Sequence, residues 1–174
     1  MGDLSPHFSR SEFACKCCNK VNIDSELISM LERLYSEMNA KAIIITSGYR
    51  CPKHSVSVGG TATDAHTRGI AADIRVVKQS GQCYTAPTIA RVAEKIGFTG
   101  IGIIDNLHCH VDIRNAHNYV NTHWFGDERN NDNYITTFAN MGEPIEKSTA
   151  KHRVHTIVYI DDKKVFDKTE GIDL

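Results

Sequence analysis

Long hydrophobic segments are missing from this sequence. A membrane-spanning helix needs about 20 consecutive apolar residues, and no run approaches that length; residues 42–45 form an apolar run that fits a buried strand. Residues 1–7 lack the basic start and the apolar stretch of a secretion signal. We therefore expect no membrane partner, and we expect synthesis in the cytoplasm without an export signal.

An excess of charge of one sign is also missing. The chain has 20 Lys and Arg residues against 21 Asp and Glu residues, a formal net charge of -1. Binding to nucleic acid through a broad basic surface requires a positive excess, so we expect no nucleic-acid partner. The length of 174 residues, with 41% hydrophobic and 24% charged residues, is that of one ordinary soluble domain.

The six cysteines lack the two Cys-x-x-Cys halves of a structural zinc ribbon. They are Cys15, Cys17, Cys18, Cys51, Cys83 and Cys109. Three interpretations stay open: reduced structural thiols, which a reducing cytosol favours, a disulfide that involves Cys51, or a second metal site.

Capping signals and apolar spacing predict three helices. Ser9 and Glu12 form a capping box, which predicts a short helix. Asp24 is a suitable N-cap for a longer helix. Its apolar residues recur at helical spacing on one face: Leu27, Ile28, Leu31, Leu34, Tyr35 and Met38. Residues 85–96 predict a third helix, with Gly97 as its C-terminal stop.

Four short apolar segments predict β-strands, at residues 42–46, 70–77, 100–104 and 107–113. Asp105 and Asn106 have the turn chemistry that joins the last two strands into a hairpin. This order of helices and strands predicts an α+β fold, in which a small antiparallel or mixed sheet has helices packed on one side.

The character of the chain changes near residue 142. We divide it into a main domain, residues 1–142, and a C-terminal extension, residues 143–174. Residues 155–160 and 165–166 resemble two short strands. About thirty residues rarely form an independent core, so the extension is either a hairpin docked on the main domain or part of a further module.

His66 and Asp73 offer two kinds of zinc donor, an imidazole and a carboxylate. Donor atoms on one zinc ion lie only a few ångströms apart, yet seven residues span roughly 10 Å along a helix and roughly 23 Å along a strand. The chain must therefore fold back between them, and Gly69 accepts the positive φ that such a turn can require. The segment is best interpreted as a loop that returns into a strand near Asp73.

Residues 107–113 carry a second group of titratable side chains. On a strand, His108, His110 and Asp112 share one face while their apolar neighbours point to the other. Such a face is costly to bury unless its groups are paired or bound to a metal; the alternative is a solvent-exposed face. A further imidazole from this face would complete the three-donor set of a catalytic zinc site with one position open, placed on the face of the sheet.

These motifs resemble a known family. His66 and Asp73, followed by His110 in His-Val-Asp, are similar to the zinc D-alanyl-D-alanine carboxypeptidases and related peptidoglycan peptidases. Residues 47–50, Ser-Gly-Tyr-Arg after an apolar strand, look like their substrate-carboxylate motif. The resemblance covers about residues 5–115, and it extends to the wider fold group of hedgehog domains and lysostaphin-like endopeptidases.

Two further segments refine the resemblance. Residues 8–15 and 58–60 are similar to a phage and bacterial branch of the group. With no export signal at its start, the chain is then expected to be a phage or prophage lysin, which reaches the cell wall after release through a membrane pore.

The resemblance implies a zinc ion held by His66, Asp73 and His110, with water at the fourth position. In the wider fold group the general base is the first His of a His-x-His pair, or an acid three residues before the last ligand. His108 matches the first form and Leu107 excludes the second. We therefore assign the base to His108, with Asp105 as the second candidate.

The resemblance also implies a substrate site. Arg50, flanked by Ser47 and Tyr49, is the candidate for holding a substrate carboxylate, because its planar guanidinium suits bidentate pairing; the alternative is a surface ion pair. Asp112 is a candidate for orienting a ligand histidine, or it is simply a strand acid at the surface. Asp64 departs from the family, in which many members have Ser at that position.

The expected function is therefore zinc-dependent hydrolysis of peptide bonds that involve D-amino acids in peptidoglycan stem peptides or cross-links, as a carboxypeptidase or an endopeptidase. The rival is a non-catalytic protein of the same fold that binds cell-wall peptide or serves as a phage structural part. The sequence leaves the oligomeric state open.

Overall fold

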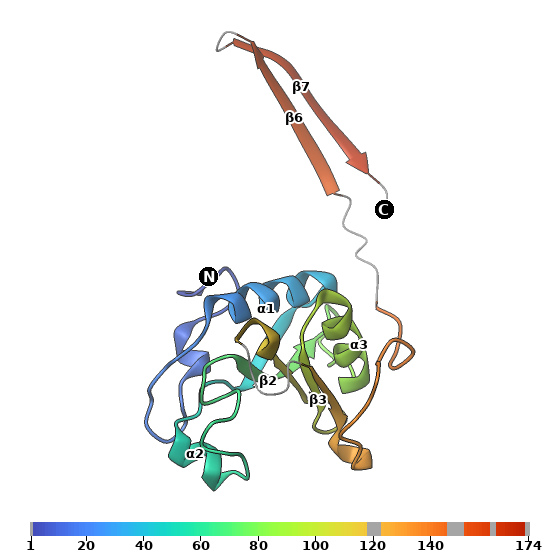
Figure 1. The fold of residues 1–174 in the computed structure, drawn as a ribbon. Helices are drawn as coiled ribbons and strands as arrows, with labels where there is room; N and C mark the ends of the chain where they lie inside the picture. Colours follow the sequence, from blue (N-terminus) through green and yellow to red (C-terminus); the bar gives the residue numbers. More distant parts are fainter. Residues whose placement is uncertain (1, 118–122, 146–151, 161–162, 173–174) are drawn as a thin grey trace.

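The computed structural model describes residues 2–117, 123–145, 152–160 and 163–172. Its main part is an α+β fold around a five-stranded sheet of order β1-β2-β4-β3-β5 (Figure 1). The helices are α1 (Ser25–Glu37), α2 (Pro52–Ser57) and α3 (Ala86–Ile96). The strands are β1 (Ala42–Ser47), β2 (Ala71–Val77), β3 (Gly100–Ile103), β4 (Cys109–Asp112) and β5 (Trp124–Asp127). Short 3-10 helices are η1 (Arg10–Phe13), η2 (Arg114–His117) and η3 (Glu128–Asn130).

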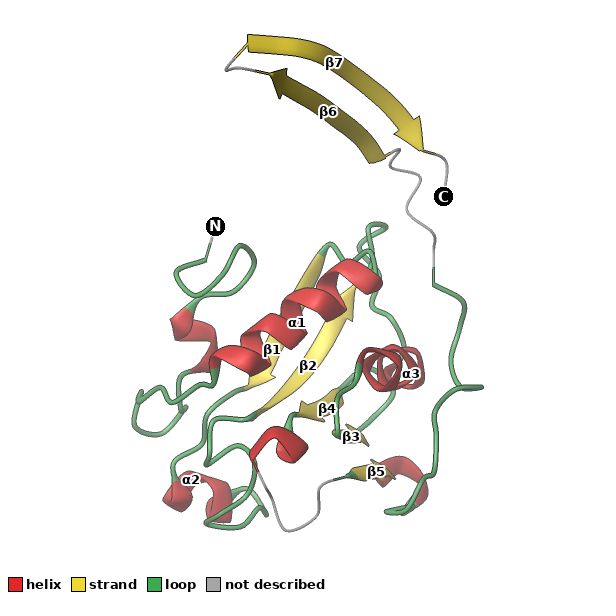
Figure 2. Cartoon of the chain, turned by 45° about the horizontal axis from the view of Figure 1, so that its top comes forward, coloured by secondary structure: helices red, strands yellow, loops and turns green. Residues whose placement is uncertain are grey.

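Helices α1 and α3 lie on the same face of the sheet, as Figure 2 shows. Their apolar stripes bury Leu31 and Ile89 completely. Strand residues such as Ile74 and Val111 are also fully buried in the same core. Removal of these apolar surfaces from water is the main stabilising contribution to such a core. The predicted fold class, a small mixed sheet with helices on one side, is confirmed.

The sheet is mixed because β3 and β5 run parallel, whereas the β1–β2, β2–β4 and β3–β4 pairs are antiparallel. The predicted hairpin of β3 and β4 is therefore confirmed. Its second strand begins at Cys109, later than predicted, because the Asp105 carboxylate accepts hydrogen bonds from the backbone N–H groups of Leu107 and His108. Two elements were not predicted: β5, which adds an edge strand, and the short helix α2.

The capping predictions are confirmed. The Asp24 carboxylate accepts from the Glu26 N–H at 2.7 Å and caps α1. Gly97 ends α3 in the left-handed conformation, at φ 102°. The Ser9 N–H donates to the Glu12 carboxylate at 2.6 Å in the predicted capping box.

The C-terminal residues contain β6 (His152–Ile160) and β7 (Lys163–Ile172), an antiparallel pair that forms a separate two-stranded sheet. The two strands predicted here are confirmed and are longer than the sequence suggested. The division into residues 1–142 and 143–174, and the docking of the hairpin, stay predictions. Among the described residues, no helix has the length and apolar character needed to cross a membrane.

Candidate metal centre

Two of the predicted zinc donors are direct neighbours across the sheet. Asp73 of β2 and His110 of β4 are Cα partners in the antiparallel pair. Directly opposed residues point to the same face of a sheet. Ile74 and Cys109, their neighbours along the two strands, point to the other face and are fully buried in the core. The two donors therefore lie on the sheet face opposite the helices.

His66 reaches this face through the predicted turn. Gly69 has φ 76°, and its N–H donates to the His66 carbonyl at 3.2 Å. A Cβ atom at Gly69 would lie 2.5 Å from the Asn22 carbonyl oxygen, so position 69 needs glycine for its conformation and for its space. The predicted loop that folds back into a strand is confirmed.

Asp64, the departure from the family pattern, holds this loop. One carboxylate oxygen accepts the Thr67 N–H at 2.9 Å, and the other accepts a short hydrogen bond from the Ser55 hydroxyl. One oxygen is thus used within the loop, and the other ties the loop to α2. The extra acid fixes the segment that carries His66.

The three donors converge in the way that one zinc ion requires. His66 Nε2 lies 3.2 Å from Asp73 Oδ1, and His110 Nδ1 lies 3.0 Å from the same oxygen. The two ring nitrogens lie 3.1 Å apart. Zinc bonds of about 2.0–2.1 Å in a tetrahedron separate the ligand atoms by about 3.3 Å. The triangle therefore fits a zinc ion once the three donor atoms move slightly apart.

Hydrogen bonds orient each histidine ring so that one nitrogen faces the other donors. His66 Nδ1 lies 2.8 Å from the Gly48 carbonyl oxygen, which can only accept, so this nitrogen carries the proton. His110 Nε2 lies 3.0 Å from an oxygen of Asp112. An acceptor on the outer nitrogen orients the ring and leaves the inner nitrogen for the metal. The inner nitrogens, His66 Nε2 and His110 Nδ1, both point into the triangle.

The site is electrostatically suited to a cation. Burial alone would raise the pKa of Asp73, but hydrogen bonds from His110 and His66 outweigh it and hold that pKa well below its usual range. Burial alone would lower the pKa of His110, whereas hydrogen bonds to Asp112 and Asp73 raise it to about 9. The carboxylates thus stabilise positive charge at the centre of the triangle.

The Asp112 carboxylate is held in place by Arg114, a residue that was not predicted from the sequence. Arg114 donates from Nε and Nη2 to the Asp112 carboxylate, at 2.9 and 2.5 Å, and both residues are buried. Burial alone would raise the pKa of Asp112, but hydrogen bonds from His110 and Arg114 outweigh it and hold that pKa below its usual range. The only signal in the sequence is the Asp-x-Arg spacing.

Two of the predicted substrate residues, Arg50 and Ser47, lie beside the triangle. Arg50 Nη2 is 3.2 Å from Asp73 Oδ2, the oxygen that faces away from the two histidines. Ser47 is the Cα partner of Asp73 on β1. Tyr49 faces another group: its N–H donates to the Phe13 carbonyl at 2.9 Å, and burial together with the nearby cysteines raises the pKa of its phenol. The alternative of an arginine paired only at the surface does not match this half-buried contact.

His108 and Asp105, the two candidates for the base, form one pair. His108 Nδ1 lies 2.7 Å from Asp105 Oδ2, and the two side chains are 31% and 55% exposed. His108 precedes His110 by two residues, about 7 Å along an extended chain. Neither residue of the pair belongs to the donor set of the triangle.

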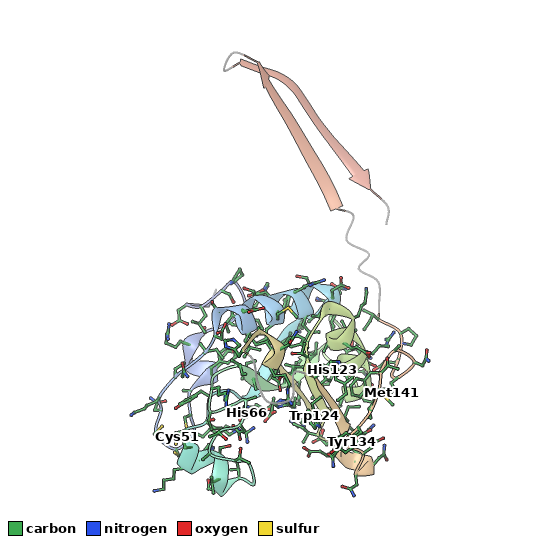
Figure 3. All side chains as sticks on the ribbon, viewed as in Figure 1. Cys51, His66, His123, Trp124, Tyr134 and Met141 are labelled. Atoms are coloured by element: carbon green, nitrogen blue, oxygen red, sulfur yellow. The ribbon has the colours of Figure 1, made fainter. Side chains whose placement is uncertain are left out.

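Trp124 of β5 flanks the site from the other side. Its ring centre lies 6.1 Å from that of His110, and the Arg114 guanidinium lies 5.3 Å from the Trp124 ring centre. A Cβ at Gly102 would be 2.8 Å from the indole, so β3 needs glycine for this approach. Figure 3 shows His66 and Trp124 in the lower half of the domain.

Comparison with known proteins agrees with this geometry. A family model described as Peptidase M15 matches residues 6–112, more than half of the chain, and the match includes all three donors. No curated protein matches the chain.

Proposed function

Because this chain belongs to the peptidase M15 family, we propose that it hydrolyses a peptide bond that involves a D-amino acid in bacterial peptidoglycan, with zinc held by His66, Asp73 and His110. The family consists of zinc peptidases that act on peptidoglycan peptides. The observation that carries the proposal is the triangle of three donor atoms, each 3.0–3.2 Å from the other two.

The residues fit the metal in number, kind and orientation. Two imidazole nitrogens and one carboxylate oxygen leave one position open, as catalytic zinc sites do. When bound, zinc supplies Lewis acidity toward the scissile carbonyl and the attacking water. Gly48 and Asp112 orient the two rings so that the ligand nitrogens face inward.

His108 is the proposed general base. Asp105 accepts from Nδ1 of His108, so Nε2 is the nitrogen that takes the proton from water. The same contact stabilises the imidazolium that results and holds the ring in one orientation. Asp105 is thereby a positioning residue in this proposal, and it becomes the base itself only if His108 is dispensable.

Arg50 is proposed to bind a carboxylate of the substrate. Its Nη2 contacts Asp73, while its buried Nε has no hydrogen-bond partner among the described residues. A planar guanidinium with unused donors suits bidentate pairing with a carboxylate. Ser47 and Tyr49 flank it, and Trp124 offers an apolar surface to the peptide on the opposite side of the site.

We further propose that the protein acts as a phage or prophage lysin, which meets the wall after release through a pore. The support is the similarity of residues 8–15 and 58–60 to a phage and bacterial branch of the group. The expected partner is the peptide part of peptidoglycan.

Digestion of purified peptidoglycan tests the proposed function. The protein with zinc should release new amino or carboxyl termini, and chelation or the His66→Ala substitution should abolish this release. Mass spectrometry of the products then separates loss of a terminal D-alanine from opening of a cross-link. Binding to peptidoglycan without any new termini would instead favour the non-catalytic rival.

A further inference from the structure

A second cluster of potential metal donors lies outside the histidine–aspartate triangle. Cys15, Cys17, Cys18 and Cys51 place their sulfur atoms within 4.8 Å of one another. The first three follow η1, and Cys51 is the N-cap of α2. Figure 3 shows Cys51 beside α2. We name these four residues the cysteine cluster.

The spacing of the sulfur atoms fits a tetrahedral metal site. Zinc–sulfur bonds of about 2.3 Å separate the sulfur atoms of a tetrathiolate site by about 3.8 Å. Cys15 Sγ lies 3.8 Å from Cys17 Sγ, and Cys17 Sγ lies 3.3 Å from Cys51 Sγ. Four thiolates in a tetrahedron favour zinc over the harder divalent cations.

The backbone around Cys15 is arranged to stabilise a thiolate. The Cys51 N–H donates to Cys15 Sγ at 3.3 Å. Burial raises the pKa of Cys15, but this hydrogen bond and those from the Cys17 and Cys18 backbone lower it to about 6. The tight turn that presents these N–H groups has Asn19 at φ 57°, and the Cys15 N–H closes it by donating to the Lys20 carbonyl at 2.8 Å.

The arrangement uses more sulfur atoms than a disulfide needs. A bridge between Cys17 and Cys51 would leave Cys15 and Cys18 unused, and all six cysteines are free in the structure. Plain reduced thiols would leave four sulfur atoms within 4.8 Å of one another with no group that binds all four. A divalent cation removes the mutual repulsion of crowded thiolates.

We propose that the cysteine cluster binds a second zinc ion in a closed, structural site that fastens the N-terminal segment to the loop of residues 48–51. Each thiol gives its proton to solvent when the metal binds. Four protein ligands leave no position for water, as is typical of structural zinc.

The loop of residues 48–51 explains what this site stabilises. The Gly48 carbonyl orients His66, and Arg50 contacts Asp73. The N-terminal segment already packs closely here, because a Cβ at Gly48 would lie 2.5 Å from the Phe13 Cα. Zinc in the cysteine cluster would therefore hold the loop that positions the triangle, without touching the substrate.

The experiment uses the full chain and reads metal rather than activity, so its outcome is independent of the proposed function. The wild-type protein should contain about two zinc ions, and the His66→Ala/Asp73→Ala double variant should keep one. With Co²⁺ in place of zinc, the double variant should show intense sulfur-to-cobalt charge-transfer absorption. Adding Cys51→Ser should remove both the remaining metal and this absorption, whereas the matched control Cys83→Ser should change neither.

Two results would overturn the inference. One is a folded double variant that binds no metal, or binds Co²⁺ without sulfur charge transfer. The other is a denatured, unreduced wild-type chain with two fewer reactive thiols than its six cysteines, which would establish a disulfide instead. The cobalt spectrum of the double variant decides the question even if the Cys51→Ser chain fails to fold.

Discussion

The triangle of His66, Asp73 and His110 and the cysteine cluster are both donor groups, yet they are built in opposite ways. The triangle has nitrogen and oxygen donors and one open side, and two of its members stand on adjacent strands. The cysteine cluster has four sulfur donors from two loops. An open site with three protein ligands suits chemistry, and a closed site with four suits structure. The number and kind of the donor atoms alone therefore indicate whether a zinc site is catalytic or structural.

The two groups also differ in how their donors are held. The histidines of the triangle are oriented by the Gly48 carbonyl and the Asp112 carboxylate. In the cysteine cluster, backbone N–H groups converge on a single sulfur atom, that of Cys15. Residues 48–51 connect the two, since they contribute to both.

The largest expected effect separates the two groups by activity. Asp73→Ala should lower peptide hydrolysis by at least about a thousandfold, because zinc supplies several kcal/mol of transition-state stabilisation. Cys51→Ser should leave most of the hydrolysis in place when the chain is folded and the triangle is saturated with zinc. Initial rates on a soluble stem peptide measure both. Equal losses in the two variants would contradict the division of roles.

The next effect concerns the base within the open site. His108→Ala should lower kcat by about 10²–10⁴-fold, because a positioned base contributes that much, while zinc content stays unchanged. Asp105→Asn should have a smaller effect, since it removes only the partner of Nδ1. The pair of rate profiles against pH, with zinc determined on the same samples, checks this. An active His108→Ala protein beside an inactive Asp105→Asn protein would transfer the base role to Asp105.

A smaller effect is expected from the partner of His110. Asp112→Asn should weaken zinc binding by about 10–100-fold, because it loosens the outer hydrogen bond of a ligand histidine. Competition with a chromophoric chelator measures the affinity, and thermal unfolding of the same variant controls for the altered contact with Arg114. An unchanged zinc affinity would contradict the role of Asp112 in orienting His110.

The smallest effect is the release of a proton from His110 when zinc binds. Hydrogen bonds to Asp112 and Asp73 raise the pKa of His110 to about 9, so the metal-free ring is protonated at pH 7 and zinc must displace that proton. Zinc affinity should therefore rise about tenfold per pH unit between pH 7 and 8, with release of about one proton. Titration calorimetry of the Cys51→Ser protein in buffers of different ionisation enthalpy isolates the first site. Binding without proton release would contradict the protonated state.

Local patterns predicted the parts of the site that depend on periodicity and turn chemistry. Strand alternation put His110 and Asp112 on one face, and Gly69 indicated the turn that returns the chain toward Asp73. Contacts between distant residues carried no such signal. The Gly48 carbonyl beside His66 and the edge strand with Trp124 became visible only in three dimensions.

The cysteine cluster shows the same limit more sharply. Cys15, Cys17 and Cys18 are adjacent in sequence, but Cys51 joins them only because η1 packs beside the end of β1. The spacing along the chain thus left three interpretations open, and tertiary packing favours one of them. The domain division at residue 142 stays a prediction for a similar reason, because local composition does not determine docking.

Anomalous X-ray scattering at the zinc edge, from crystals of the zinc-loaded full chain, tests the assignment of both metal sites. We expect two anomalous peaks, one for each zinc ion. One is bonded to His66 Nε2, Asp73 Oδ1 and His110 Nδ1, with a free position toward solvent; the other lies among the four sulfur atoms of the cysteine cluster. A well-ordered map without zinc at the triangle, or with zinc on His110 Nε2 instead, would contradict it.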